Sequence, residues 1–379
     1  MRAFVFTDKA LERYAGRFVW LAVDTENAKN AAFLTKYPIP ALPTLLVLDP
    51  RKESVALRYV GGATVPQLSK ILDDGERSFR GRTSSSADTL LASADKLAGE
   101  GKSDEAIALY AQALARAPKN WKLFNRAAES YAVALSLAGK SPQCADVARD
   151  LYPRLKGTAS GANVAATGLD CALGLDEKDP KRPALVSLLE KAARESFDDP
   201  KVAAAMSGDD RSGLYMTLIG ARADAKDEAA AQRLTQEWSS FLDAEAARAK
   251  TPEQRSVYDP HRLSAYLELK TPEKAIPMLE QTERDFPDDY NPPARLALAY
   301  KAMKQYDQAL AASDRALQHV YGPRKITVLR ARADIYAEKG DKESAKKTIA
   351  EAVAYAKSLP TGQRNERTIA SLEKKLAGM

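Results

Sequence analysis

The chain has 379 residues, of which 45% are hydrophobic and 28% are charged; this composition is ordinary for a folded protein and argues against disorder throughout. Single hydrophobic cores rarely grow to this length, so we expect more than one domain. The net charge of +6 comes from 57 basic and 51 acidic residues that are interspersed, which argues against nucleic-acid binding, and no apolar run is long enough for a membrane helix.

The first 78 residues are predicted to form an α/β unit, because helix-like and strand-like segments alternate there. The expected helices are Arg2–Ala15, Ala28–Tyr37 and Val65–Asp74, and the expected strands are Phe18–Asp24, Thr44–Leu48 and Val55–Val60. The last two strands are joined by the turn "DPRKES", which Pro50 is well placed to start. Mostly apolar strands are typical of a sheet that is covered on both faces.

A linker is predicted next. The segment Glu76–Asp88, "ERSFRGRTSSSAD", is rich in Ser, Arg and Gly and has no apolar periodicity. Such a composition is typical of a connection between domains, and we place the linker at residues 79–88. After it the sequence becomes rich in Ala, Leu, Lys and Glu and loses its strand signals, so the rest of the chain is expected to be all-α.

The helical part contains an internal repeat. Three tyrosines are spaced by 34 and 36 residues, and three alanines keep the same spacings nine residues later. The residues concerned are Tyr266, Tyr300, Tyr336, Ala275, Ala309 and Ala345. A period of this size with small and aromatic residues at fixed offsets resembles tetratricopeptide (TPR) helix pairs.

The stretch "LASADKLAGEGKSDEAIALYAQALARAPKNW" matches this repeat best. Gly101 falls at the turn, Ala106, Tyr110 and Ala113 fall at core positions of the second helix, and Pro118 falls at its end. Small alanines let two antiparallel helices approach closely, and a proline ends a helix. We therefore predict a TPR-type helical-repeat solenoid.

The repeat register weakens between Pro142 and Lys250. Inserts such as "KGTASGANVAATG" and "DEKDPKRPA" interrupt it, and we expect them to protrude from one face of the solenoid. Divergent hairpins are still expected there, for example Leu214–Asp224 with Glu228–Ala247. The predicted organisation is an α/β unit at 1–78, a linker at 79–88, TPR-like repeats at 89–141, divergent helical hairpins at 142–250 and TPR-like repeats at 251–379.

Cys144 and Cys171 are the two cysteines of the chain, and they lie 27 positions apart without a CxxC motif. This spacing fits no zinc site, so the first interpretation is a pair of buried free thiols. The alternative is a disulfide between adjacent helices, which would imply an oxidising compartment.

The amino-terminal part resembles the later part of a thioredoxin-fold domain, as found in thiol:disulfide interchange reductases. The resemblance rests on "FVWLAVDTENAKNAAFLTKYPIPALPTLLVLDP" and "VGGATVPQLSKIL", and it covers about a fifth of the chain. It implies a cis peptide bond before Pro43 and a substrate-peptide groove at Leu42, Pro43, Thr44 and Gly62. Trp20 departs from the family, which often has a lysine near this place.

The redox motif of that family is missing. The family's CxxC lies just before the position at which this chain begins, and the strand that leads into it would be central in the sheet. We therefore expect an N-terminally incomplete domain, with Met1 as a mis-assigned start or a fragment boundary. The charged start "MRAFVFTDKALERYAG" is no signal peptide, so the chain as written is expected in the cytoplasm, or in the periplasm if an upstream signal has been lost.

No motif for cofactor or metal chemistry is recognisable. The chain has no P-loop, Rossmann glycine pattern, HExxH or serine-nucleophile elbow. His261 and His319 fall in separate hairpins and are interpreted as surface or capping residues, and doubled acids such as Asp288-Asp289 as solvated helix caps. We accordingly predict no catalytic residue, no metal and no cofactor.

Three functions compete. The first is a protein-binding scaffold whose concave repeat face carries the residues Asn125, Glu129, Lys301, Arg330 and Asp334. The second is a thiol–disulfide oxidoreductase, which needs a reactive thiolate that this chain lacks near Pro43. The third is a chaperone-like protein in which the groove beside Pro43 accepts an extended peptide by strand addition. We favour the scaffold, with a protein or peptide partner.

Overall fold

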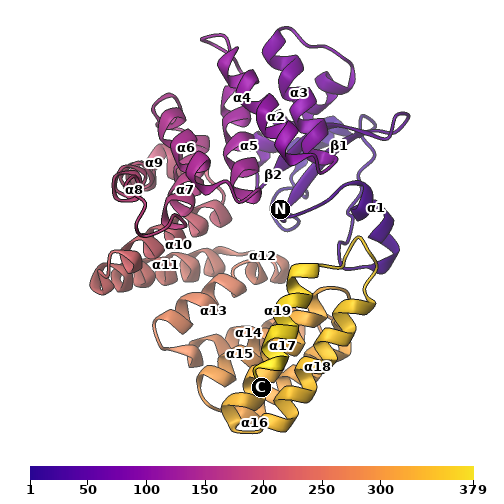
Figure 1. Cartoon of the computed structure of the whole chain (residues 1–379), viewed down its shortest axis with the longest axis vertical. Coiled ribbons are helices and arrows are strands. Elements are labelled where there is room, and N and C mark those ends of the chain that lie inside the picture. Colours follow the sequence, from indigo (N-terminus) through magenta and orange to yellow (C-terminus); the bar gives the residue numbers. More distant parts are fainter. The chain divides into compact units, whose positions relative to one another are not determined.

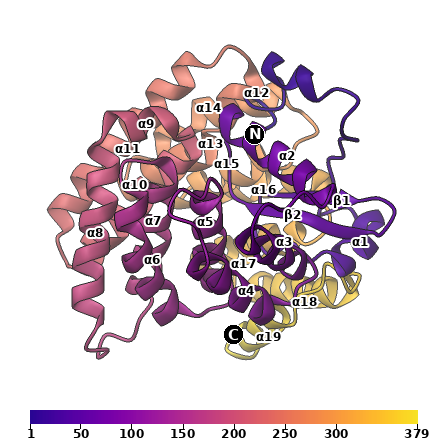
Figure 2. The same cartoon turned by 90° about the horizontal axis from the view of Figure 1, so that it is seen from above.

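A computed structural model describes residues 1–379 and divides into two compact units (Figures 1 and 2). Unit 1 comprises Met1–Phe18 and Tyr37–Leu234, and unit 2 comprises Val19–Lys36 and Thr235–Met379. The chain therefore passes between the units three times, after residues 18, 36 and 234.

The elements of unit 1 are one short 3-10 helix, two strands and nine α-helices. They are η1 (Lys9–Tyr14), β1 (Thr44–Asp49), β2 (Ser54–Val60), α2 (Val65–Phe79), α3 (Ser86–Gly99), α4 (Ser103–Ala115), α5 (Phe124–Leu137), α6 (Ser141–Leu155), α7 (Ala159–Leu173), α8 (Arg182–Asp198), α9 (Pro200–Ala205) and α10 (Gly208–Asp224).

Helix α11 (Glu228–Arg248) runs across the boundary between the units, and unit 2 contains the remaining elements. They are η2 (Ala28–Asn30), α1 (Ala31–Lys36), α12 (Pro252–Ser256), α13 (Asp259–Glu268), η3 (Pro272–Lys274), α14 (Ala275–Asp285), α15 (Asn291–Ala302), α16 (Tyr306–His319), α17 (Arg324–Lys339), α18 (Lys342–Ser358) and α19 (Glu366–Ala377).

The predicted β-hairpin is confirmed. Strands β1 and β2 pair antiparallel, from Thr44 opposite Val60 to Asp49 opposite Ser54, and the Leu42–Pro43 bond is cis as expected. Helix α2 begins where predicted and continues five residues further. Its start is held by Gln67, whose Oε1 accepts a hydrogen bond from the Thr64 backbone N–H at 2.7 Å.

The helix expected at Ala28–Tyr37 is present as η2 and α1, but two other amino-terminal predictions are wrong. Residues 18–24 form no strand, and the segment Val19–Lys36 belongs to unit 2. Arg2–Ala15 forms turns and the 3-10 helix η1 instead of an α-helix. The sheet has only β1 and β2, so the structure shows no clear thioredoxin fold.

The hairpin is part of the same compact unit as the first repeats. A side chain at Gly99 of α3 would place its Cβ 2.5 Å from Val55 of β2, so this close packing requires glycine. Beneath the hairpin, the buried Asp95 accepts hydrogen bonds from the Tyr110 hydroxyl and from Nη1 of Arg126, both at 2.7 Å. The predicted boundary at residue 78 therefore does not separate compact units, and the linker is shortened to residues 80–85 between α2 and α3.

The repeat prediction is confirmed at its core positions. Ala106, Tyr110 and Ala113 of α4 are buried, and so are Ala275, Ala309 and Ala345 of unit 2. The turns between paired helices adopt left-handed backbone conformations, with φ of 57° at Lys270, 59° at Lys304 and 93° at Gly340. These turns recur at the spacings of the sequence repeat, and Gly101 occupies the same conformation before α4.

The predicted insert "KGTASGANVAATG" is wrong, because most of it forms helix α7. A side chain at Gly168 would put its Cβ 2.2 Å from the Cβ of Ala148 on α6, so the small residues allow two helices to pack closely. Figure 2 shows α6, α7 and α8 side by side. The predicted hairpin Leu214–Asp224 with Glu228–Ala247 corresponds to α10 and α11.

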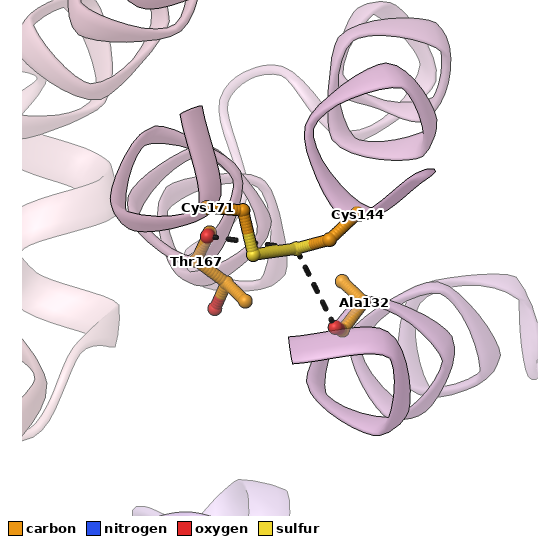
Figure 3. Close-up of a disulfide and its surroundings, with 4 residues drawn as sticks. All are labelled: Ala132, Cys144, Thr167 and Cys171. Atoms are coloured by element: carbon orange, nitrogen blue, oxygen red, sulfur yellow. Dashed lines mark hydrogen bonds between the residues drawn. A yellow bond between two sulfur atoms is a disulfide. The ribbon is translucent and has the colours of Figure 1, made fainter. Parts of the chain in front are cut away.

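Helices α6 and α7 are cross-linked. Cys144 and Cys171 form a disulfide with a Cα–Cα distance of 6.0 Å (Figure 3), so the free-thiol interpretation is wrong and the alternative is confirmed. The carbonyl oxygens of Ala132 and Thr167 lie 3.8 and 3.7 Å from the Cys144 sulfur. A disulfide sulfur carries no proton, so these are packing contacts. None of the helices combines the length and the apolar character that crossing a membrane requires.

Candidate functional site

A cavity of about 500 Å³ lies in unit 1, where the end of β2 meets helices α5, α7 and α10. Helix α7 contacts both α5 and α10, and α5 and α7 are the first helices of the pairs α5–α6 and α7–α8. The cavity is lined by Tyr59, Val60, Gly61, Gly62, Glu129, Val133, Asn163, Val164, Ala166, Thr167, Asp170, Asp209, Asp210, Gly213, Leu214, Met216, Thr217 and Gly220.

The end of β2 reaches the cavity through a tight backbone contact. The Gly61 N–H donates to the Pro43 carbonyl at 2.9 Å, and Gly61 has a φ of +125° that favours glycine. This contact holds Tyr59 and Gly62 at the cavity wall. The Tyr59 hydroxyl lies 3.4 Å from Oε2 of Glu129 on α5.

Asp210 is positioned by the start of α10. The Asp210 backbone N–H donates to Oγ of Ser207 at 3.0 Å, and the Ser207 N–H donates to Oδ2 of Asp210 at 3.4 Å. This reciprocal cap fixes the carboxylate in the first turn of the helix. Further along α10, a Cβ added at Gly213 or Gly220 would meet nothing within 4 Å, so both glycines leave the cavity open.

The cavity is acidic. Four carboxylates line it, from Glu129, Asp170, Asp209 and Asp210, and no Lys, Arg or His does. Burial raises the pKa of Glu129 to about 7; a hydrogen bond from Ser160 opposes this shift, and the nearby charge of Asp210 adds to it. Desolvation also raises the pKa values of Asp170 and Asp210. The charged forms of Glu129, Asp170 and Asp210 are therefore unfavourable in this cavity. No group of three or more His, Cys, Asp or Glu residues is arranged to hold a metal ion.

Two of the predicted site residues meet in this cavity. Gly62, predicted for the peptide groove, and Glu129, predicted for the concave repeat face, both line it. Leu42, Pro43 and Thr44 do not line it: Leu42 is exposed, and Thr44 opens β1 opposite Val60. Peptide binding by strand addition beside Pro43 stays a prediction, and β1 pairs on one side only.

The remaining predicted concave-face residues lie elsewhere. Asn125 is partly buried on α5 and is not in the cavity wall. In unit 2, Lys301 forms an ion pair with Glu338 at 3.0 Å, Asp334 pairs with a lysine of α19, and Arg330 is exposed on α17. Their role in partner binding stays a prediction.

The sequence analysis did not predict the asparagine and the three aspartates of the cavity wall: Asn163, Asp170, Asp209 and Asp210. Asn163 and Asp170 lie on α7, and Asn163 falls within the segment 156–168 that was predicted to be an insert. The sequence "SGDD" at 207–210 has the spacing of a helix-capping box and could have marked the start of α10.

The cysteines form no redox site. The two cysteines are buried and form a disulfide with each other, so the chain has no free cysteine. The exchange reaction of a thioredoxin needs an accessible thiolate. The oxidoreductase hypothesis therefore has no support in the residues of this chain.

Comparison with known proteins identifies the repeats. The tetratricopeptide repeat family model matches residues 290–358. Among solved structures, MamA of AMB-1 is 16% identical with a TM-score of 0.25 and covers 49% of this chain and 95% of its own. The TPR2AB domain of yeast Sti1, in its pHSP90 complex, is 16% identical with a TM-score of 0.28. The match covers 77% of this chain and 98% of the Sti1 chain. A chain of the APC/C hetero-tetramer Cut9–Hcn1 is 13% identical with a TM-score of 0.29. The match covers 82% of this chain and 69% of that chain. A search of curated proteins finds no match.

The chain thus contains tetratricopeptide repeats, which supports a protein-interaction scaffold as its class. The thioredoxin-like part of our sequence interpretation has no counterpart among these matches.

Proposed function

We propose that this chain is a protein-binding scaffold and that its unit 1 cavity accepts a basic side chain from an extended segment of a partner protein. The observation that carries the proposal is the cavity wall, which contains four carboxylates and no cationic residue. A lysine or arginine entering the cavity would supply the missing positive charge. The partner is therefore expected to present a basic residue.

The cavity also has room and apolar surface for the residues beside that side chain. Its volume of about 500 Å³ exceeds the space of one lysine, and Val133, Leu214 and Met216 contribute apolar surface to its wall. Apolar neighbours of the basic residue would bury surface against these side chains. We expect a short motif in which a lysine or arginine is flanked by hydrophobic residues.

Selection from a phage-displayed library of 12-residue peptides on the immobilised full chain tests this function. The expected result is a set of binding peptides enriched in a single lysine or arginine next to apolar residues. Selected peptides are then titrated against Glu129→Gln and Asp209→Asn, each of which removes a cavity carboxylate, and we expect weaker binding to both.

The matched control is Asp104→Asn, which removes an exposed carboxylate of α4 that lies outside the cavity wall. It should bind the selected peptides as the wild type does. Selection of acidic peptides, or equal loss of binding in the control, would refute a basic ligand in this cavity.

The disulfide supports an oxidising compartment for this scaffold. Cytosolic thiols are usually kept reduced, whereas exported proteins keep structural disulfides. Acid quenching of producing cells followed by maleimide labelling under denaturing conditions tests this point. No mass shift is expected before reduction, and two labels are expected after it; labelling without reduction would place the chain in a reducing compartment.

A further inference from the structure

Residues 24–26 pack against the ends of three helices in unit 2. The segment Val19–Lys36 belongs to this unit, although it lies far from its other residues in the sequence. Asp24, Thr25 and Glu26 contact residues 290, 321, 324 and 363. Unit 2 therefore already holds an acidic segment of its own chain.

Hydroxyl and guanidinium groups donate hydrogen bonds to the two acidic side chains. Oδ2 of Asp24 accepts a hydrogen bond from the Tyr321 hydroxyl at 2.6 Å. Oε1 of Glu26 accepts one from Nε of Arg324 at 3.0 Å, and the Tyr290 hydroxyl lies 3.4 Å from both carboxylate oxygens. Arg324 thus supplies a positive charge to an acidic ligand.

Residues of unit 2 also contact the backbone of the segment. Nε2 of Gln363 donates to the Thr25 carbonyl at 2.9 Å. A Cβ at Gly322 would lie 2.1 Å from the carbonyl oxygen of Glu26, and one at Gly362 would lie 2.2 Å from that of Ala31. Larger residues at either glycine would therefore exclude the segment, which shows that the surface fits a main chain closely.

The residues that contact the segment lie at corresponding places in successive repeats. Tyr290 precedes α15, Arg324 opens α17, and Gln363 precedes α19. The amino-terminal end of an α-helix carries partial positive charge, which favours a nearby carboxylate. Three such ends beside one segment make this edge of the repeats suited to an acidic ligand.

The segment presents its two acids through a local turn. Oδ1 of Asp24 accepts a hydrogen bond from the Glu26 backbone N–H at 2.9 Å, and Nδ2 of Asn30 donates to the Asp24 carbonyl at 2.8 Å. This turn places the Asp24 and Glu26 side chains on the receiving surface together. The recognised feature is consequently an Asp-x-Glu turn.

We propose that the edge surface, made of Tyr290, Tyr321, Arg324 and Gln363, is a second binding site that takes an acidic Asp-x-Glu segment of a partner protein. Residues 24–26 occupy it as an internal competitor. The surface uses residues of unit 2 alone, so it is separate from the unit 1 cavity and does not depend on the function proposed for it.

Exchange of the internal segment is physically reasonable. The Arg324 side chain is 53% exposed and Tyr321 is 48% exposed, so part of the surface faces solvent. Contacts of this kind are individually weak. The internal segment nevertheless stays bound because it is part of the same chain, which gives it an effective concentration in the millimolar range at the surface. An external ligand is therefore expected to bind weakly until the internal segment is disabled.

The test uses a fluorescein-labelled synthetic peptide of residues 19–36 and the full chain. Fluorescence anisotropy is measured for the wild type and for Asp24→Asn with Glu26→Gln, which weakens the internal competitor and leaves the edge surface intact. We expect the double variant to bind the peptide at least about tenfold more tightly than the wild type. A peptide with the same two substitutions should not bind.

Two further variants in the Asp24→Asn, Glu26→Gln background locate the site. Arg324→Gln should reduce peptide affinity at least about tenfold, whereas Lys339→Gln, which removes an exposed cation at the other end of the same helix, should not change it. Equal affinity of the wild type and the double variant, or equal binding by the Arg324 and Lys339 variants, would overturn the proposal. The oligomeric state of the double variant with bound peptide is measured by size-exclusion chromatography. Peptide binding only by a dimer would also overturn the proposal, because the surface would then bind the segment 19–36 of a second copy of this chain.

Discussion

Replacing Glu129 with glutamine removes the buried carboxylate of the cavity while keeping its shape. The side chain lies 3.4 Å from the Tyr59 hydroxyl and 3.4 Å from Nδ2 of Asn163, and an amide oxygen can keep one of these contacts. The pKa of Glu129 is raised to about 7 chiefly by burial. The variant therefore isolates the cost of charging this group inside the protein.

The size of the effect follows from linkage. In the unfolded chain the Glu129 carboxyl ionises near its ordinary pKa of 4.5, and in the folded chain near about 7. Between these pH values the folded state binds more protons, so the free energy of unfolding falls as the pH rises. The full difference corresponds to about 3 kcal/mol. The variant should match the wild type near pH 4.5 and exceed it by about 3 kcal/mol at pH 8.

Urea unfolding at pH 5, 6, 7 and 8 measures this difference. Unit 1 contains Trp121 but neither Trp20 nor Trp238, so a Trp20→Phe, Trp238→Phe background reports the unfolding of unit 1 by fluorescence. Asp170 and Asp210, whose pKa values are also raised, are present in both proteins. The contribution of Asp170 largely cancels in the comparison, whereas the measured difference includes the repulsion between Glu129 and Asp210.

The exposed Glu105 on α4 provides the control, since Glu105→Gln should change stability by less than about 0.5 kcal/mol at every pH. A constant difference between Glu129→Gln and the wild type from pH 5 to pH 8 would refute the reasoning. So would a variant that is less stable at pH 8.

Three further experiments test the packing of the repeats. Replacing Cys144 and Cys171 with alanine should lower the free energy of unfolding by about 3 kcal/mol, because it opens a cross-link over 27 residues; dithiothreitol should then have no further effect in urea unfolding. Lys304→Gly relieves a φ of 59° and should raise stability by about 1 kcal/mol, whereas Lys304→Ala should not. Gly168→Ala should lower the free energy of unfolding by about 1–3 kcal/mol, because its Cβ would lie 2.2 Å from the Cβ of Ala148. Ala148→Gly should restore part of this loss in a double-mutant cycle. Additive losses of stability in the two variants would contradict this contact.

The repeats were predictable because their signal is local and periodic. Each helix pair places small residues at fixed offsets, so Ala309 and Ala345 could be assigned to the core from spacing alone, and both are buried. Helix α7 was missed because its alanines, glycines and threonines lack a strong apolar stripe. Its helical state depends on close packing against α6, which spacing along the chain does not reveal.

The amino-terminal segment failed for a related reason. The apolar run 18–24 has the composition of a strand, yet residues 24–26 meet partners between residues 290 and 363. Such distant contacts override local propensity. The cavity is likewise assembled from β2, α5, α7 and α10, so Gly62 and Glu129 were each selected for separate reasons, and their meeting was not foreseen.

Calorimetric titration of a selected basic peptide into Gly220→Leu tests the central claim most directly. A leucine at this position enters the open cavity, and no atom within 4 Å of its Cβ opposes it; replacing a helical glycine also favours the fold. We predict a folded variant that no longer binds the peptide, while Gly220→Ala, which fills little of the cavity, still binds it. Unchanged affinity of Gly220→Leu would show that the peptide binds elsewhere and would contradict the proposed site.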